Sequence, residues 1–142
     1  MRIVVRGRPA PQGSKRHVGG GRMIEMSKAV GPWREAVRTE TQLAMRHEPP
    51  LGCPVEVNIM FYLKRPASHY RTGRNAHLLR DNAPEWPAGK PDLDKLARAV
   101  LDGLTMGGAW KDDSQAVRLD VIKLYAVGSH APGCIINLAK AG

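Results

Sequence analysis

The clearest hydrophobic pattern in the chain lies within residues 92–106. Apolar or small side chains recur there at the i, i+3, i+4, i+7 spacing of a helix with one buried face: Leu93, Leu96, Ala97, Val100, Leu101 and Leu104. Gly107 and Gly108 follow, and glycine commonly ends a helix. The pattern predicts an amphipathic helix that starts at Asp92 and stops before these glycines.

Other segments show the patterns of strands and of a second helix. Apolar residues at helical spacing predict a helix over 32–46, in which Pro32 suits the first turn. Runs of β-branched or alternating apolar residues, bounded by glycine or proline, are typical of strands. Strands are expected at five places: residues 2–6, 22–26, 55–63, 117–127 and 134–138. We therefore expect a single small α+β domain, residues 1–142, with a mixed β-sheet and two main helices.

The composition indicates a polyanionic partner. The chain has 142 residues, with 22 Lys+Arg against 13 Asp+Glu, a net charge of +9 and a pI near 10.1. Such a charge attracts nucleic acid. A basic structural protein of the ribosomal type and a protein bound to an anionic membrane surface are the other classes that this charge allows.

The sequence carries no signal for secretion, membrane insertion or an organic cofactor. The N-terminus has too few apolar residues for a signal peptide, and no run approaches the roughly 18 apolar residues of a membrane span. The five histidines lack paired ligand spacing, which argues against zinc. Cys53 and Cys134 form no CxxC pair, so we expect two reduced thiols in a soluble, cytoplasmic protein.

Residues 64–91 are basic, contain aromatic side chains and show no periodicity. A loop of this length is uncommon in a compact domain and is usually functional or disordered. Interleaved cations and aromatics suit contacts to a nucleic-acid backbone and stacking on unpaired bases. The cations expected to bind DNA lie in this loop and in a flexible segment near residue 15: Lys15, Arg16, Arg65, Arg71, Arg74, Arg80 and Lys90.

Four of the 13 acidic residues form two tight pairs, Asp92 with Asp94 and Asp112 with Asp113. Mg²⁺ is held by one or two carboxylates together with phosphate oxygens of a substrate. Paired acids in a basic protein therefore suggest a nuclease. A structural role for the first pair remains open, because Asp is a preferred N-cap and a carboxylate in the first turn gains from the helix dipole.

Three further side chains near the acidic pairs have competing interpretations. Arg98 lies four residues after Asp94 and four before Asp102, a spacing that predicts a ladder of ion pairs on one helix face. Arg98 is also placed to stabilise charge on a scissile phosphate. Asp102 is interpreted as structural, and Trp110 is expected to pack in the core rather than to stack on a base.

Two motifs surround the acidic pairs. The first is Lys90-Pro91-Asp92-Leu93-Asp94-Lys95-Leu96, continued by Ala99-Val100-Leu101-Asp102-Gly103-Leu104, and the second is Trp110-Lys111-Asp112-Asp113-Ser114-Gln115-Ala116-Val117. Together they resemble the RusA family of Holliday junction resolvases. The match is close over about residues 90–125 and looser over the rest, where the expected elements follow the family order.

The resemblance implies a RusA-like fold and a Mg²⁺-dependent crossover junction endodeoxyribonuclease, with Mn²⁺ as a substitute metal. Such an enzyme acts as a homodimer and cuts four-way DNA junctions by paired symmetric nicks. The resemblance assigns metal binding to four aspartates: Asp92, Asp94, Asp112 and Asp113. The family pattern Asp-x-Asp-Asn-x-x-Lys has a functional lysine after the second aspartate. Here Lys95 occupies the asparagine position and Arg98 the lysine position, so either would supply the catalytic cation.

Two other functions remain open on the sequence alone. A nuclease with broader selectivity, acting on flaps or other branched DNA, would use the same residues. A non-catalytic junction-binding protein would account for the positive charge but would not need four acids near the DNA. A resolvase would act in DNA recombination and repair in a bacterial cell, and its gene would belong to the host, a phage or a prophage.

Overall fold

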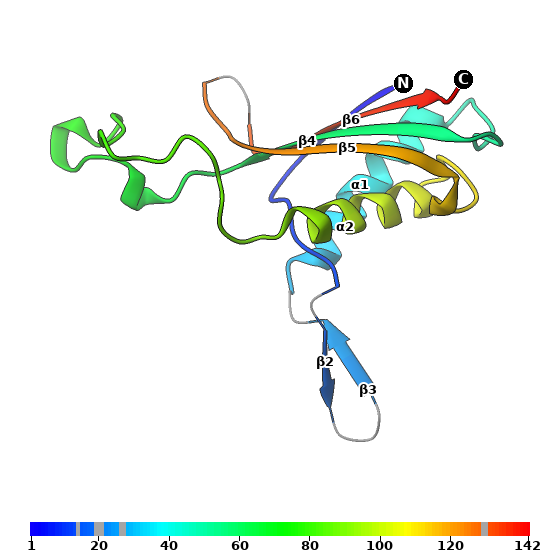
Figure 1. Ribbon diagram of the computed structural model, residues 1–142, viewed down its shortest axis with the longest axis horizontal. Coiled ribbons are helices and arrows are strands. Elements are labelled where there is room, and N and C mark those ends of the chain that lie inside the picture. Colours follow the sequence, from blue (N-terminus) through cyan, green and yellow to red (C-terminus); the bar gives the residue numbers. More distant parts are fainter. Residues whose placement is uncertain (14, 19–21, 26–27, 129–130) are drawn as a thin grey trace.

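A four-stranded sheet with two helices packed on one face forms the body of the protein (Figure 1). The computed structural model describes residues 1–13, 15–18, 22–25, 28–128 and 131–142. The elements are β1 (Arg2–Arg6), β2 (Lys15–Val18), β3 (Arg22–Glu25), α1 (Val30–Met45), β4 (Val55–Leu63), α2 (Leu93–Met106), β5 (Ala116–Tyr125) and β6 (Gly133–Lys140).

The main sheet is mixed, with the strand order β1-β6-β4-β5. β6 runs antiparallel to both β1 and β4, whereas β4 and β5 are parallel. The parallel pair needs a crossover, and the long loop together with α2 supplies it. The expected α+β class, mixed sheet and two main helices are thus confirmed.

The core lies between the sheet and the helices. Alternate residues of β4 point into it, and Val57, Ile59 and Phe61 are at most 1% exposed. α2 contributes its predicted apolar stripe, of which Leu96 and Val100 are fully buried. Each such side chain stabilises the fold by about 1.5–3 kcal/mol, so the central strand and α2 are held together by a shared apolar layer.

Two glycines, one in α2 and one at its C-terminal cap, allow the helices to approach closely. A carbon added at Gly103 would lie 2.6 Å from Cγ1 of Val37, and one added at Gly107 would lie 2.5 Å from Cβ of Thr41. Both facing side chains are fully buried, and the Thr41 hydroxyl donates to the Val37 carbonyl at 2.7 Å. Because α1 cannot give way, this contact fixes the position of α2.

Most predicted boundaries differ from the structure by one or two residues. Strands 2–6 and 55–63 are confirmed at those bounds, and strands 117–127 and 134–138 are observed as β5 and β6 with shifted ends. α1 begins two residues before the expected start, because the side chain of Val30 is buried at 3% exposure and so joins the first turn to the core.

The segment near residue 15, which was expected to be flexible, has a regular backbone. Lys15–Val18 forms β2 and pairs with β3 residue for residue, so that the expected short strand at 22–26 is confirmed at Arg22–Glu25. Backbone pairing between β2 and β3 holds this segment in a strand, although its basic composition predicted a flexible chain. The hairpin projects away from the helices (Figure 1).

The loop at 64–91 has no long regular element, as expected. It contains two single turns of 3₁₀ helix, at Ala67–His69 and Gly73–Asn75, and one bridge between Tyr70 and Leu79. It extends beyond the end of the sheet before it returns to α2 (Figure 1). The basic loop is therefore folded on itself rather than packed under the sheet.

The remaining predictions about the body of the protein concern its thiols and membrane segments. Both cysteines are free, and burial raises the pKa of the Cys134 thiol far above its usual range. In the part of the chain that the structure describes, no helix is both long and apolar enough to cross a bilayer.

Replacing Gly103 with alanine is expected to lower the free energy of unfolding. Overpacking a core costs about 1–3 kcal/mol, whereas the better helix propensity of alanine returns only about 1 kcal/mol. Gly31→Ala is the matched control, because a carbon added at Gly31 in α1 meets nothing within 4 Å. Urea denaturation of both variants measures the difference, and equal stability of G103A and the wild type would contradict close helix packing.

Candidate functional site

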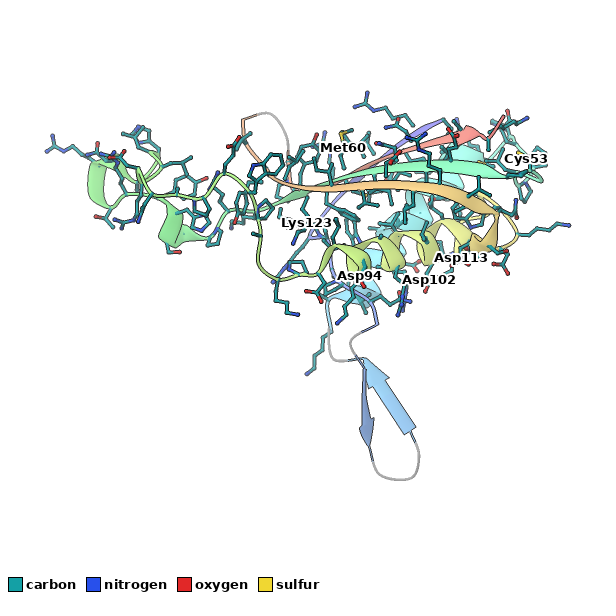
Figure 2. All side chains as sticks on the ribbon, viewed as in Figure 1. Cys53, Met60, Asp94, Asp102, Asp113 and Lys123 are labelled. Carbon is teal, nitrogen blue, oxygen red and sulfur yellow. The ribbon has the colours of Figure 1, made fainter. Side chains whose placement is uncertain are left out.

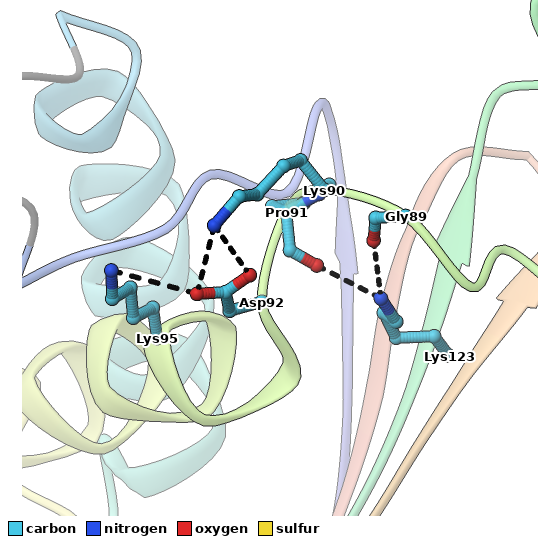
Figure 3. Close-up of polar contacts among 6 residues, drawn as sticks. All are labelled: Gly89, Lys90, Pro91, Asp92, Lys95 and Lys123. Atoms are coloured by element: carbon cyan, nitrogen blue, oxygen red, sulfur yellow. Dashed lines mark hydrogen bonds and ion pairs between the residues drawn. The ribbon is translucent and has the colours of Figure 1, made fainter.

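Asp92 occupies the predicted N-cap position of α2, but its side chain makes no capping hydrogen bond. Instead its carboxylate accepts hydrogen bonds from Nζ of Lys90 at 3.0 and 3.2 Å and lies 3.5 Å from Nζ of Lys95 (Figure 3). The Lys90 hydrogen bond, aided by the charge of both lysines, holds the pKa of Asp92 below its usual range. Asp92 is therefore an ionised carboxylate among cations, and capping does not explain it.

Lys123 of β5 fixes the backbone just before Asp92. Its Nζ donates to the carbonyl oxygens of Gly89 at 2.8 Å and Pro91 at 2.9 Å (Figure 3). Sequence reasoning missed this residue, because its position beside the buried face depends on the strand register. Lys123 pairs in register with the buried Phe61 of β4, so it is a charged residue in an apolar row of the sheet.

Asp94 and Arg98 are exposed on the first two turns of α2. Within the described residues, Arg98 forms no ion pair with Asp94 or Asp102, so the predicted ladder is wrong. Its guanidinium lies against Gly13 instead, where an added carbon would meet Nη1 at 2.6 Å. The N-terminal loop thus takes the place of the expected ladder partners.

Gln12 joins that loop to both helices. Its backbone N–H donates to the Lys95 carbonyl at 3.0 Å, and its side chain donates to the Asp102 carboxylate and accepts from Arg34 of α1 at 2.7 Å. The interpretation of Asp102 as a structural residue is consistent with these contacts. Trp110 is 2% exposed and donates to the Thr105 hydroxyl at 2.7 Å, so its predicted place in the core is confirmed.

The second acidic pair forms a compact turn before β5. Asp112 caps the 3₁₀ turn Asp113–Gln115 by accepting from the Ser114 N–H at 2.9 Å, and Gln115 completes the capping box. Gln115 also donates to the Leu51 carbonyl at 2.7 Å. These contacts anchor the turn, and they give Asp112 a structural role that Asp92 lacks.

The carboxylate of Asp113 is destabilised in its charged form. Partial desolvation raises its pKa, and the neighbouring carboxylates of Asp112 and Asp102 raise it further. Like charges that lie close together are the usual cause of such a shift, and a cation placed between them would reverse it. Asp113 therefore lies where a positive ion would be stabilised.

The two acidic pairs lie at opposite ends of α2 in one chain. Figure 2 shows Asp94 at the start of the helix, Asp102 along it and Asp113 beyond its end. A helix of 14 residues is about 21 Å long. Among the described residues, no three acidic, histidine or cysteine side chains converge on one point. The single chain does not bring together the aspartates that the motifs suggested.

The predicted DNA-binding cations differ in what surrounds them. Arg71 pairs with Asp81 at 2.9 Å, Arg80 donates to the Ser68 carbonyl at 3.2 Å, and Arg74 lies on an exposed turn. Arg65 is 8% exposed, and Lys90 is bound to Asp92. The side chains of Lys15 and Arg16 fall outside the described residues. The loop thus carries exposed cations along with one buried arginine.

Replacing Lys123 with methionine is expected to loosen the approach to α2 and to lower the free energy of unfolding by about 1–3 kcal/mol, because two hydrogen bonds to a charged group are lost. Hydrogen exchange at the Leu96 amide, which donates to the Asp92 carbonyl at 3.1 Å, measures the local effect. Lys140→Met, at an exposed lysine near the C-terminus, is the matched control. Unchanged exchange in K123M would show that Lys123 does not hold this segment.

Comparison with known proteins identifies the family of the chain. The model of the family described as Endodeoxyribonuclease RusA matches residues 6–138 of the 142. No curated protein matches the chain. The family match includes both acidic motifs, the central strand and the basic loop, and it implies Holliday junction resolvase activity. The chain belongs to the RusA family of endodeoxyribonucleases.

Proposed function

We propose that the protein is a Mg²⁺-dependent homodimeric resolvase that cuts four-way DNA junctions by paired symmetric nicks in DNA recombination and repair. The observation that carries this proposal is the state of Asp92. Its carboxylate is ionised, spared from capping, adjacent to Asp94 and surrounded by lysines. A helix start with that arrangement suits a cation and a phosphate together.

The donor chemistry of the site fits Mg²⁺, because carboxylate oxygens are the ligands that hard divalent cations prefer. Asp92, Asp94 and Asp113 would hold the metal, with Asp112 alongside and Mn²⁺ as a substitute. When bound, the metal polarises the phosphodiester and lowers the pKa of a water molecule. Two carboxylates together with phosphate oxygens suffice for such a site.

The cations near Asp92 would bind and orient the DNA. Lys95 and Arg98 lie on the first turns of α2 and would offset the negative charge that builds on the phosphate. Arg98 differs from lysine in its planar geometry and permanent charge, so its role here is to bind rather than to transfer a proton. The exposed loop arginines would hold the flanking strand.

The homodimer would form through β5. This strand is an edge of the sheet and, among the described strands, pairs only with β4. It exposes three large apolar side chains: Val117, Leu119 and Ile122. A long apolar edge is a ready site for pairing with another strand. Antiparallel pairing of β5 with a second copy would create a continuous eight-stranded sheet about a twofold axis.

That pairing would complete the acidic site. Lys123 holds the segment before Asp92 near the end of β5, whereas Asp113 directly precedes the beginning of β5. In an antiparallel pair, the end of one strand lies opposite the beginning of the other. Asp92 and Asp94 of one protomer would therefore approach Asp113 of its partner. The two composite sites would be related by a twofold axis, which matches the near-twofold symmetry of an open junction.

Purified protein with Mg²⁺ is expected to nick a labelled immobile four-way junction at symmetric positions. Asp94→Asn should lower the rate by on the order of 100-fold or more, because metal stabilisation of the transition state contributes several kcal/mol. EDTA should abolish cleavage, and Mn²⁺ should restore it. Tight binding without cleavage in any metal would identify a non-catalytic junction-binding protein.

The same assay distinguishes the resolvase from a broader nuclease. Four-way, three-way and flap substrates are compared at one salt concentration, because binding to DNA depends strongly on salt. A resolvase cuts the four-way junction fastest and in pairs. Comparable rates on flaps would favour the broader activity.

Mixing D94N with D113N tests the composite site directly. If each site takes Asp94 from one protomer and Asp113 from the other, a mixed dimer contains one intact site and one doubly altered site. The mixture is then expected to regain nicking activity that neither variant has alone. No recovery, although subunits exchange as shown by mass spectrometry, would place all three aspartates of a site on one chain.

A further inference from the structure

A large groove lies beside the start of α2. It has a volume of about 1470 Å³ and is lined by residues 6–11, 63–67 and 89–92, with Tyr70, Lys95 and Tyr125 among its other walls. These segments meet where the loop leaves β4 and returns to α2 (Figure 1). Small-molecule pockets usually occupy about 300–1,000 Å³, so the groove is large enough for a segment of polymer.

The charge of the groove favours a polyanion. Six cations line it: Arg6, Arg8, Lys64, Arg65, Lys90 and Lys95. Asp92 is the one acidic residue among the described lining residues, and it is already paired with two of these lysines. The remaining four cations have no carboxylate partner in the described part of the chain. Three of them, Arg6, Arg8 and Lys64, were not among the cations predicted to bind DNA.

Arg65 is unusual among the four because it is buried. Its side chain is 8% exposed, yet no described carboxylate neutralises it. Nη1 donates to the Pro84 carbonyl at 2.6 Å and lies 3.2 Å from Nδ1 of His69, and the guanidinium lies 4.3 Å from the ring centroid of Tyr125. Its Nε is buried without any hydrogen-bond partner.

A buried charge without a counter-ion is costly. The desolvation penalty of a single ion in a protein exceeds what a cation–π contact returns. One neutral carbonyl does not cancel the charge either. The contacts of Arg65 fix the plane of its guanidinium at the wall of the groove but leave its charge without a counter-ion, which is the state of a preformed anion site.

We propose that Arg65, together with Arg8, binds a backbone phosphate of the DNA strand that carries the scissile bond. This inference rests on the proposed nuclease function and adds a phosphate subsite to it. Because Arg65 and Asp92 line one continuous groove, a strand seated there would extend from the acidic residues toward the basic loop. Nη2 of Arg65 makes no hydrogen bond in the described part of the chain, so its N–H groups are left for a phosphate oxygen. The subsite holds the strand in register and does not select bases.

The rival explanation is that Arg65 has only a structural role, in which it links the loop to β5 through its contacts with Pro84 and Tyr125. Salt dependence separates the two roles, because each phosphate that a protein neutralises contributes about 0.7–0.9 to the slope of log K against log salt. If Arg65 has only a structural role, its replacement changes the affinity for DNA without changing that slope. The slope is measured by fluorescence anisotropy with a labelled four-way junction, using the full chain in EDTA so that no cleavage occurs.

R65Q is expected to bind the junction more weakly and to reduce the magnitude of the slope by about 0.7–0.9. R65K keeps the charge and should keep the slope. Arg46→Gln is the matched control. Arg46 follows the C-terminal end of α1, whereas Ala29, just before the other end, lines the groove, and α1 is about 24 Å long. Arg46 is therefore far from the groove, and the R46Q variant should show the same slope as the wild type. A weaker R65Q complex with an unchanged slope would overturn the phosphate subsite.

Arg8→Gln provides a second test that does not depend on a buried residue. Arg8 is exposed in the loop after β1, so its replacement should leave folding intact and reduce the slope in the same way. If R65Q fails to fold, the salt dependence of R8Q is the deciding measurement. An unchanged slope of log K against log salt in R8Q would overturn the subsite. Absence of any junction binding by the wild type would instead overturn the proposed function, and this subsite with it.

The source of the phosphate is tested separately. Thermal unfolding of the wild type and of R8Q is followed in the presence of inorganic phosphate or of a short single-stranded oligonucleotide. A strand subsite predicts that the oligonucleotide raises Tm at concentrations where phosphate does not, and that R8Q shows a smaller rise. Equal stabilisation by inorganic phosphate would identify a site for the free ion and would contradict the proposal.

Discussion

The close contact between α1 and α2 is the constraint on which the rest of the protein depends. Gly103 and Gly107 bring α2 against Val37 and Thr41, and the sheet supports α2 from its other side. Every acidic residue of the site is attached to this helix or to the turn that follows it. The position of α2 therefore decides where the carboxylates lie, and a single methyl group at the contact would move them.

Electrostatics explains how acidic residues persist in so basic a chain. Lys90 and Lys95 stabilise the ionised form of Asp92, while Lys123 holds the backbone on either side of Lys90 without touching the carboxylate. At the other end of α2, desolvation and the carboxylates of Asp112 and Asp102 raise the pKa of Asp113. Lysines thus contact the carboxylate at one end of the helix, whereas carboxylates lie near the one at the other end. Two copies paired through antiparallel β5 strands about a twofold axis would bring these ends together.

The same end of the sheet combines a large basic groove with the start of the acidic helix. Arg65 is held there by a carbonyl, a histidine and a tyrosine ring, none of which carries a negative charge to match it. A protein that needed Arg65 only for stability would gain from a carboxylate or an apolar residue at that place. An unpaired buried charge is tolerated where a ligand supplies the missing partner.

Local periodicity and motifs were enough to predict part of this protein. The stripe from Leu93 to Leu104 defined α2, alternation defined β4, and the two aspartate motifs indicated the family. The predicted helix already separates Asp94 from Asp113 by its whole length. Packing in three dimensions alone decided that Arg98 meets Gly13 rather than its ladder partners and that Lys123 positions Asp92. These features depend on contacts between residues far apart in the chain, and such contacts are set by packing and strand order, which a linear pattern does not encode.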